Sequence, residues 1–380
     1  MEFLQYRPTT LVWVLLGALA LMLIIQTVYY FAVYGKLFFK RKKQNLTSPK
    51  QNEVLPPISV IIATKNEEYN LKERLGFFLE QDYPEFEVIV VNDASTDETE
   101  YILKAFSKLY TNLKVVNIVE NVNKFRGKKF PISLGVKSAK YDHLIFSNAD
   151  CQTQGFEWLK YMASHFDEEH QIVIGFSRFQ KCKGFFNNIL QYDNATTAMN
   201  FMGLALSGKP YRGDGRNIAY HKDLFYKVGG FTKHYNITLG EDDIFIKDTA
   251  TSKNTTVALE PESFVITSTK RTFKDWKSEK KNRIQTYKQY KPATKFFLSI
   301  LPWTTTLFYL FGATLALISF PYQYLLIALL LKFILQITIY FKTCRCLGIK
   351  RIFIFAPLFE IYFLFFNARI RLVSLFTKKV

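Results

Sequence analysis

The chain has few cysteines, and those it has are poorly spaced for binding a metal. Four occur among 380 residues, at Cys151, Cys182, Cys344 and Cys346. They do not form the two pairs typical of structural zinc sites, and one residue between Cys344 and Cys346 is too tight a spacing for most metal sites. We therefore expect reduced thiols on the cytoplasmic side of a membrane and no zinc centre.

Glycine-rich phosphate loops are also missing from the sequence. No strand-like apolar run is followed by a G-x-G-x-x-G sequence or by a Walker-type sequence. Dinucleotide-binding folds and phosphate-loop ATPases need such loops because the backbone must approach the phosphates closely. Their absence argues against both classes of protein.

Acidic residues are scarce relative to basic ones. The chain has 50 lysines and arginines against 32 acidic residues, which gives a formal net charge of +18. Such an excess is typical of proteins that bind nucleic acid, an anionic membrane surface or phosphate-bearing substrates. Much of the positive charge flanks long apolar segments, so we expect a membrane and not a nucleic acid as the partner.

The first apolar segment contains no charged residue. It covers residues 10–34, which is enough to cross a hydrocarbon core of about 30 Å as a helix. A secretory signal peptide would have a shorter apolar core and a cleavage site of small residues, so an uncleaved signal anchor within residues 1–43 is favoured. Lysines and one arginine follow from Lys36 to Lys43, which predicts that the chain is cytoplasmic from residue 36 onward.

A soluble domain is expected over residues 44–270. Strand-like runs at residues 58–62, 86–91, 113–119 and 144–146 each end in polar residues, and helical patterns lie between them. This alternation predicts an α/β fold with a doubly wound, mostly parallel sheet.

Two polar segments in this domain are candidates for chemistry. Asn148 and Asp150 follow the fourth strand and alternate, so both can point to one spot that suits a hard divalent cation and substrate phosphates. The alternative is an ordinary strand-to-helix turn with an Asx cap. The acids Glu241, Asp242 and Asp243 precede a helical pattern. They are either a source of a general base or a charged first helical turn.

Basic and aromatic residues alternate over residues 271–295. This composition just before an apolar run predicts an amphipathic interfacial segment, with a solvated basic surface as the alternative. The rest of the chain, residues 296–380, is expected to form a membrane region. Within it, residues 296–320 and 322–341 predict a helical hairpin.

The last apolar run, residues 352–367, is short for a membrane span and contains Pro357 and Glu360. A re-entrant or interfacial element is therefore favoured, and a further span is the alternative. Lys332 and Glu360 are isolated ionisable residues in apolar surroundings. Two alternatives follow: they pair with each other in a helix bundle, or Lys332 extends to the membrane surface.

Taken together, these segments resemble the family 2 glycosyltransferases, whose soluble domain has the GT-A fold. Five short motifs carry the resemblance, over roughly residues 55–290. They are Ile58–Glu68 with an Asn-Glu-Glu signature, Val91–Thr99, Gly127–Lys129 with Leu134–Gly135, Asn148–Asp150 at the Asp-x-Asp position, and Gly240–Asp242 at the x-Glu-Asp position. Each motif is weak alone, but their order and spacing make a strong signal.

The resemblance implies a membrane-anchored, metal-dependent, inverting glycosyltransferase with a nucleotide-diphospho-sugar transferase sheet. It implies nucleotide-sugar contacts from Ala63, Thr64, Glu67, Asp93, Lys128 and Asn148. It implies Mg²⁺ or Mn²⁺ held by Asp150 on the sugar diphosphate, and Asp242, beside Glu241, as the base for the acceptor hydroxyl. We further expect Arg216, Lys280 and Arg283 on the acceptor or diphosphate side.

Two departures from the family pattern affect these expectations. Asn148 replaces the usual first aspartate, and Asn92 replaces the first acid of the earlier pair. An amide accepts hydrogen bonds but brings no charge. Processive synthases end this domain with Gln-x-x-Arg-Trp, whereas residues 279–284 here lack the tryptophan. One or a few sugar transfers are therefore favoured over processive synthesis.

The resulting hypothesis is a multi-pass enzyme of the plasma (inner) membrane with a cytoplasmic catalytic domain. It would move a sugar from a UDP- or GDP-linked donor to a lipid-linked or glycan acceptor in cell-surface glycan synthesis. One alternative is a processive polysaccharide synthase of the cellulose or hyaluronan type, which product length distinguishes. Another is a non-catalytic scaffold that keeps the nucleotide-sugar fold, motivated by Asn92 and Asn148.

Overall fold

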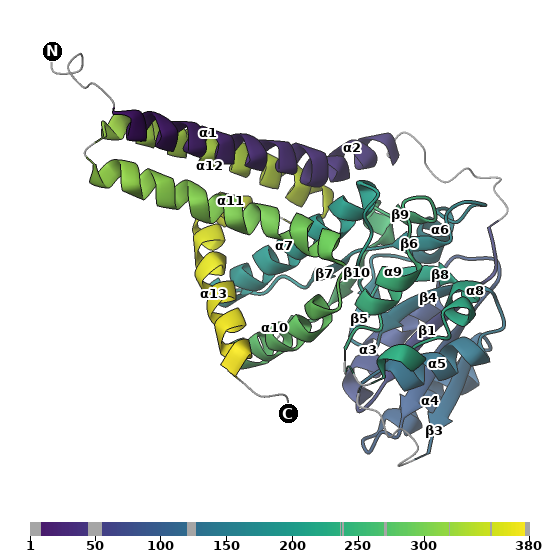
Figure 1. Ribbon diagram of the computed structural model, residues 1–380. Coiled ribbons are helices and arrows are strands. Elements are labelled where there is room, and N and C mark those ends of the chain that lie inside the picture. Colours follow the sequence, from purple (N-terminus) through teal and green to yellow (C-terminus); the bar gives the residue numbers. More distant parts are fainter. Residues whose placement is uncertain are drawn as a thin grey trace.

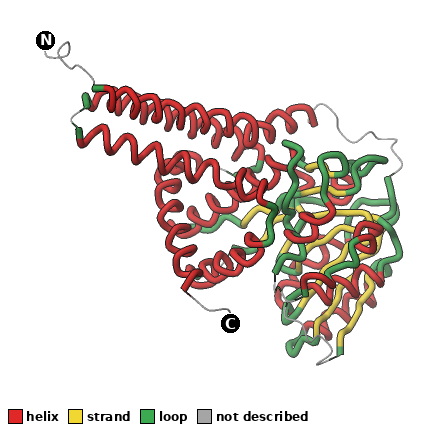
Figure 2. Tube along the Cα trace, viewed as in Figure 1, coloured by secondary structure: helices red, strands yellow, loops and turns green. Residues whose placement is uncertain are grey.

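A computed structural model of the protein has an α/β domain joined to a group of long helices (Figures 1 and 2). It describes residues 9–44, 55–119, 127–235, 237, 239–269, 272–318, 320–349 and 352–376. The strands are β1 (Ile58–Thr64), β2 (Phe86–Asp93), β3 (Leu113–Ile118), β4 (His143–Asn148), β5 (Cys151–Thr153), β6 (Ile172–Ile174), β7 (Ser177–Phe179), β8 (Ile218–His221), β9 (Thr255–Val257) and β10 (Val265–Thr267).

Helices of two kinds accompany these strands. Those that pack around the sheet are α3 (Glu68–Leu79), α4 (Thr99–Leu109), α5 (Lys129–Ser138), α6 (Trp158–Ala163), α8 (Lys222–Lys227) and α9 (Asp243–Thr249). Those toward the long helices are α1 (Thr10–Tyr29), the π-helical turn η2 (Tyr30–Tyr34), α2 (Gly35–Gln44), α7 (Phe185–Leu206), α10 (Phe273–Lys288), α11 (Pro292–Leu317), α12 (Tyr322–Cys346) and α13 (Ala356–Phe376).

The main sheet of the described residues has seven strands in the order β3-β2-β1-β4-β8-β6-β9. Neighbouring strands are parallel except around β8, which is antiparallel to β4 and β6. Alternate residues of β1 enter different cores, with Ile61 on the side of α5 and Val60 and Ile62 on the side of α3. β1 is buried along its whole length, as expected of a strand covered on both faces. The predicted doubly wound, mostly parallel sheet is confirmed.

The register of the central strands brings their polar ends together. Ala63 in β1 is opposite Asn148 in β4, and Thr64 is opposite Asn92 in β2. Parallel strands that end at one level deliver the following turns to one edge of the sheet, which is where α/β proteins bind ligands.

Four helices are long and apolar enough, by length and composition, to cross a membrane: residues 10–43, 292–317, 322–346 and 352–373. The helix α1 packs along α11. Figure 1 shows α1, α11 and α12 side by side with a shared direction, while α13 runs across them. The expected anchor and hairpin therefore form one three-helix group.

The helix α13 is longer than the apolar run at residues 352–367 suggested. It has 21 residues and follows a short 3₁₀ turn, η5 (Ile352–Phe355). Its crosswise course is compatible with the predicted interfacial element, whereas its length is also sufficient for a span. Where it lies relative to the membrane stays a prediction.

A buried ion pair joins α13 to the three-helix group. The ammonium of Lys332, which is fully buried in α12, donates to the carboxylate of Glu360 in α13. Thr305 in α11 adds a hydrogen bond to Glu360 Oε1 at 3.2 Å. The structure therefore shows the paired alternative for the two isolated charges. The Glu360 carboxylate of α13 contacts both α11 and α12.

The helix α7 connects the α/β domain to the N-terminal helix. A Cβ on Gly203 would lie 2.7 Å from the carbonyl oxygen of Val33, so only glycine allows this approach of α7 to η2. Ser207 Oγ also donates to the Ala32 carbonyl at 2.9 Å, and Lys36 Nζ to the Leu206 carbonyl at 3.3 Å. The domain is thus held directly against the membrane helix.

A pair of glycine-to-alanine changes tests the packing of α5 on the sheet. A Cβ at Gly135 would meet Ile61 Cγ2 at 2.5 Å, whereas one at Gly76 in α3 has its nearest neighbour at 3.7 Å. We expect Gly135→Ala to destabilise the fold by about 1–3 kcal/mol through overpacking. Gly76→Ala should instead stabilise it by about 0.5–1 kcal/mol. Thermal melting of the detergent-solubilised variants measures both, and equal shifts would contradict the close packing of α5.

Candidate active site

A cleft of about 280 Å³ lies at the carboxyl edge of the sheet, between the ends of β1 and β4, the start of α9, and α10. The predicted site residues that line it are Ala63, Lys128, Asn148, Asp150, Arg216, Glu241, Asp242 and Arg283. Asp150 and Asp242 come from distant parts of the sequence but face the same cleft. The two candidate carboxylates therefore belong to one site.

The turn after β4 is held by hydrogen bonds on several sides. Asp150 Oδ2 accepts a hydrogen bond from Thr267 Oγ1 at 3.0 Å. The Arg74 guanidinium donates to the backbone carbonyl of Asp150. At the end of the strand, Lys128 Nζ donates to Asn148 Oδ1 at 2.9 Å. The Asp150 carboxylate is thus fixed in position, and an ammonium lies beside the amide that stands at the first Asp-x-Asp position.

The donor atoms at this turn suit a hard divalent cation bound together with phosphates. No group of three or more His, Cys, Asp or Glu side chains is arranged to hold a metal ion in the part of the chain that the structure describes. Mg²⁺ is usually held by one or two carboxylates, with waters and substrate phosphate oxygens completing its coordination. The lone Asp150 carboxylate fits that mode and does not fit a closed cage of protein ligands.

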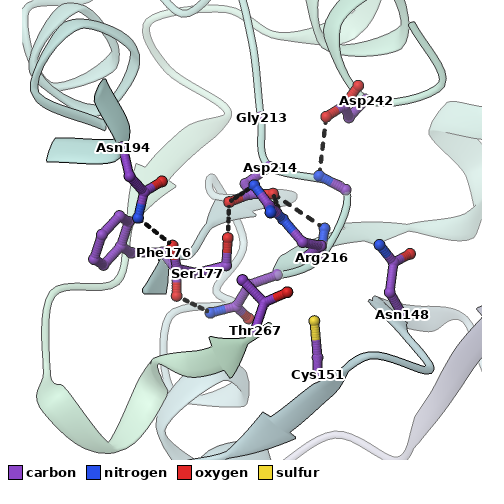
Figure 3. A network of polar contacts seen from close by, with 12 residues as sticks. Asn148, Cys151, Phe176, Ser177, Asn194, Gly213, Asp214, Arg216, Asp242 and Thr267 are labelled. Atoms are coloured by element: carbon purple, nitrogen blue, oxygen red, sulfur yellow. Dashed lines mark hydrogen bonds and ion pairs between the residues drawn. The ribbon is translucent and has the colours of Figure 1, made fainter. Parts of the chain in front are cut away.

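Asp242 has two partners, both of them backbone N–H groups. Its Oδ1 accepts a hydrogen bond from Asp243 N–H at 2.9 Å, which caps α9. Its Oδ2 accepts one from Gly215 N–H at 3.0 Å, as Figure 3 shows. The helix-start interpretation of these acids is therefore confirmed for Asp242, which also lines the cleft, while the general-base interpretation stays a prediction. The two backbone contacts orient the carboxylate.

The acids on either side of Asp242 differ in their surroundings. Burial, and next the charge of Asp242, raise the pKa of Glu241. Burial also raises the pKa of Asp243, to about 7, although Arg212 opposes this shift from an ion pair of 2.9 Å. Tyr290 donates a further hydrogen bond to Asp243 at 2.9 Å. The Asp243 carboxylate is thus buried and bonded to Arg212 and Tyr290. We therefore keep Asp242, which lines the cleft, as the candidate base.

A buried polar network supports the wall of the cleft opposite Asn148 (Figure 3). Arg216 Nε donates to Asp214 Oδ1 at 3.0 Å, and the Ser177 hydroxyl donates to the same carboxylate. Burial alone would raise the pKa of Asp214, but Arg216 and Ser177 lower it below its usual value. The ionised Asp214 therefore holds the Arg216 guanidinium at the cleft.

Lys129 is a site residue that the sequence did not single out. Its side chain is buried, and its ammonium donates to the carbonyls of His234 at 2.7 Å, Leu239 at 3.1 Å and Ile237. These carbonyls lie just before Glu241, so Lys129 ties α5 to the segment that carries the candidate base. Burial lowers the pKa of Lys129, against the charges of Glu241 and Asp242. Nothing in the local sequence distinguishes it from a surface lysine.

Three residues predicted to contact the nucleotide lie at the same sheet edge without lining the 280 Å³ cleft. They are Thr64 and Asp93, at the ends of β1 and β2, and Glu67, just before α3. Thr64 is buried, and its hydroxyl has no hydrogen-bond partner among the described residues. Such a buried hydroxyl is expected to have a partner, and a bound ligand would supply one.

The structure does not bring Lys280 into the cleft. Arg283 and Glu279 on α10 line it and form an ion pair of 2.9 Å. Lys280 instead pairs with Asp193 of α7 and lines a different cavity. Residues 279 and 283 are about one turn apart, whereas residue 280 is rotated by about 100° from residue 279 and points toward the neighbouring face of the helix.

The chain matches the model of "Glycosyl transferase family 2" over residues 59–229. It carries a family 2 glycosyltransferase domain. The chain is 31% identical over 127 residues to the poly-beta-1,6-N-acetyl-D-glucosamine synthase of Staphylococcus epidermidis. The aligned residues cover 33% of this chain and 29% of that relative. The probable glycosyltransferase YdaM of Bacillus subtilis is 27% identical over 198 residues, or 50% of this chain and 46% of that protein. The chain thus spans less than half the length of these relatives.

The arrangement of the family 2 domain and its helices is similar to a solved structure. The mannosyltransferase PcManGT from Pyrobaculum calidifontis, in complex with GDP-Man and Mn²⁺, superimposes with a TM-score of 0.55 at 19% sequence identity. The match covers 91% of this chain and 99% of that one. This likeness confirms the GT-A fold.

The contacts of Lys129 predict an effect on the segment before Glu241. Lys129→Met would leave three carbonyls without their donor, at about 1–3 kcal/mol for each one that stays buried. We expect amide exchange over residues 234–240 to accelerate at least tenfold. Lys137→Met, at the exposed end of the same helix, should leave that exchange unchanged. Hydrogen–deuterium exchange measures both, and slow exchange in the Lys129 variant would contradict the positioning role.

Proposed function

We propose that the protein is a membrane-bound, inverting glycosyltransferase. It moves a sugar from a UDP- or GDP-linked donor to a lipid-linked or membrane-proximal acceptor in cell-surface glycan synthesis. The observation that carries the proposal is the shared cleft, which both Asp150 and Asp242 line. The family 2 domain supports the same reaction class.

In the proposed reaction, the acceptor hydroxyl attacks the anomeric carbon as the bond to the β-phosphate oxygen breaks. Asp242 takes the hydroxyl proton, and the nucleoside diphosphate leaves with the bonding electrons. Ala63, Thr64, Glu67 and Asp93 would hold the nucleotide at the strand ends. A divalent cation bound at Asp150 would stabilise the negative charge on the leaving diphosphate. Lys128, Arg216 and Arg283 would add positive charge around the same group.

The geometry also supports a cytoplasmic site in the inner membrane. The basic last turn of α2 contains Arg41, Lys42 and Lys43, and α12 ends with Arg345 in its last turn. Arg41 also donates to the backbone carbonyl of Cys346, so the two basic ends lie together. Figure 1 shows this end of the helices beside the α/β domain. By the positive-inside rule, the domain would face the cytoplasm.

The roles of the two carboxylates predict loss of activity without loss of fold. Asp242→Asn keeps a good helix cap but removes the base, and Asp150→Ala removes the metal ligand. We expect each to lower sugar transfer by at least about 100-fold, in line with general-base contributions, with an unchanged elution profile. Asp223→Asn makes the same chemical change at the exposed start of α8 and should keep full activity. Transfer of a radiolabelled sugar measures the effect, and full activity in both site variants would refute the proposal.

The identity of the donor follows from a screen of nucleotide-sugars with and without Mn²⁺. We expect one class of donor to release its nucleoside diphosphate. EDTA should abolish this release, because the negative charge on the leaving nucleoside diphosphate needs stabilisation by a divalent cation. Added Mn²⁺ should restore the activity of the wild type but not of Asp150→Ala. Binding of a donor with no turnover under any condition would support the non-catalytic scaffold instead.

A further inference from the structure

A second cavity, of about 440 Å³, lies between the family 2 domain and the long helices. Its walls come from η2, α7, α10, α11, α12 and α13. The helix α10 separates it from the catalytic cleft, because Glu279 and Arg283 face the cleft while Lys280 faces this cavity. The two spaces therefore lie on adjacent faces of a single helix.

The cavity lining is rich in hydroxyl and amide groups. Tyr34 and Tyr29 donate to Asn200 Oδ1 at 3.2 and 3.3 Å. Trp276 Nε1 and the Lys280 ammonium donate to the Asp193 carboxylate. The lining side chains with hydroxyl or amide groups are Tyr30, Tyr34, Tyr192, Thr196, Thr197, Asn200, Ser299, Thr305, Thr306, Tyr340 and Asn367. This composition suits a ligand that carries many hydroxyl groups.

The charges around the cavity are nearly balanced. The lining includes two carboxylates, Asp193 and Glu360, and two cations, Lys280 and Arg371. Both carboxylates are paired with ammonium groups, Asp193 with Lys280 and Glu360 with Lys332. A site for a phosphate or diphosphate usually has an excess of cations. Counting Lys332, three cations and two carboxylates lie in or beside the cavity. Because both carboxylates are already paired with ammonium groups, we take this small excess as favouring a ligand without net charge over a diphosphate.

Part of the lining is apolar and comes from helices that are apolar enough to cross a membrane. Leu298, Leu301 and Trp303 come from α11, and Phe363 and Leu364 come from α13. The Trp303 side chain is 63% exposed, and tryptophan is enriched at membrane surfaces because it has an apolar ring and a polar N–H. An alkyl chain can therefore leave the cavity along α11 and α13.

We propose that this cavity binds the head group of an uncharged, hydroxyl-bearing lipid, such as a glycosylated glycerolipid. The head group contacts the polar side chains of α7 and η2, and the alkyl chains lie along α11 and α13. Resting on the proposed function, this lipid is the acceptor, and its hydroxyl reaches the catalytic cleft past α10. A lipid head group that carries phosphate is disfavoured because both ammonium groups, Lys280 and Lys332, are already paired with carboxylates.

Photo-crosslinking tests the ligand class without requiring turnover. The full chain is placed in phosphatidylcholine nanodiscs with an alkyl glucoside that carries a diazirine on its sugar. We expect labelled peptides from residues 185–206 and 292–317. A tenfold excess of unlabelled alkyl glucoside should reduce labelling at least fivefold, whereas the same excess of alkyl phosphate should not. Equal competition by the two compounds, or labelling spread evenly over all the long helices, overturns the proposal.

Two threonines of α11 provide a matched pair of variants. Thr306 lines the cavity and Thr314 does not, and each hydroxyl donates to the carbonyl four residues earlier, at 2.8 and 3.0 Å. Thr306→Trp should fill the cavity and reduce labelling at least fivefold, while Thr314→Trp should label like the wild type. If Thr306→Trp does not fold, Thr197→Leu makes a smaller change on the opposite wall, with the same expected loss. Unchanged labelling in a folded lining variant overturns the proposal.

The donor screen keeps this inference separate from the proposed function. If no nucleotide-sugar releases a nucleoside diphosphate, the proposed function fails. The crosslinking result still decides what the cavity binds. If a donor is found, the wild type should transfer its sugar to an alkyl glucoside at least tenfold faster than to an alkyl phosphate. The reverse preference would overturn the assignment of the acceptor and leave the transferase activity intact.

Discussion

The parallel pairing of β1 with β4 is the constraint on which the site depends. Because Ala63 and Asn148 are opposite each other in the ladder, the turns that follow the two strands must emerge at the same level. A shift of one residue would turn the side chains of β4 to the other face of the sheet. The burial of β1 on both faces makes such a shift costly, so the hydrophobic cores also determine the position of Asp150.

The sheet and the ends of its strands were predictable because their signals are local. Runs of β-branched residues mark buried strands, and the polar residues after them mark the carboxyl edge. The acids at residues 241–243 were harder to interpret, since a helix cap and a catalytic base use the same residue types. In the structure, one oxygen of Asp242 caps α9 and the other accepts a hydrogen bond from Gly215 N–H at the cleft, so the cap is compatible with the proposed role as a base.

Other parts of the site depend on contacts between distant segments and leave no mark in the sequence. Lys129 reads as one more cation in a basic protein, and its role arises only because the segment before Glu241 folds over it. The side of α10 that Lys280 would face also could not be chosen in advance. The helix is polar along most of its length, and its orientation is set by Trp276, which stacks on Phe366 of α13.

The close contact of Gly203 with Val33 has a consequence for which acceptors the enzyme can use. Because α7 lies directly on the N-terminal helix, the family 2 domain would have little freedom to tilt or rise if the long helices cross a bilayer as proposed, and the cleft would then stay at a set height above it. A reactive hydroxyl must then project from the membrane by that same distance. The protein would select acceptors by the distance between the membrane surface and the reactive hydroxyl. Acceptors in which this distance is longer or shorter would react poorly.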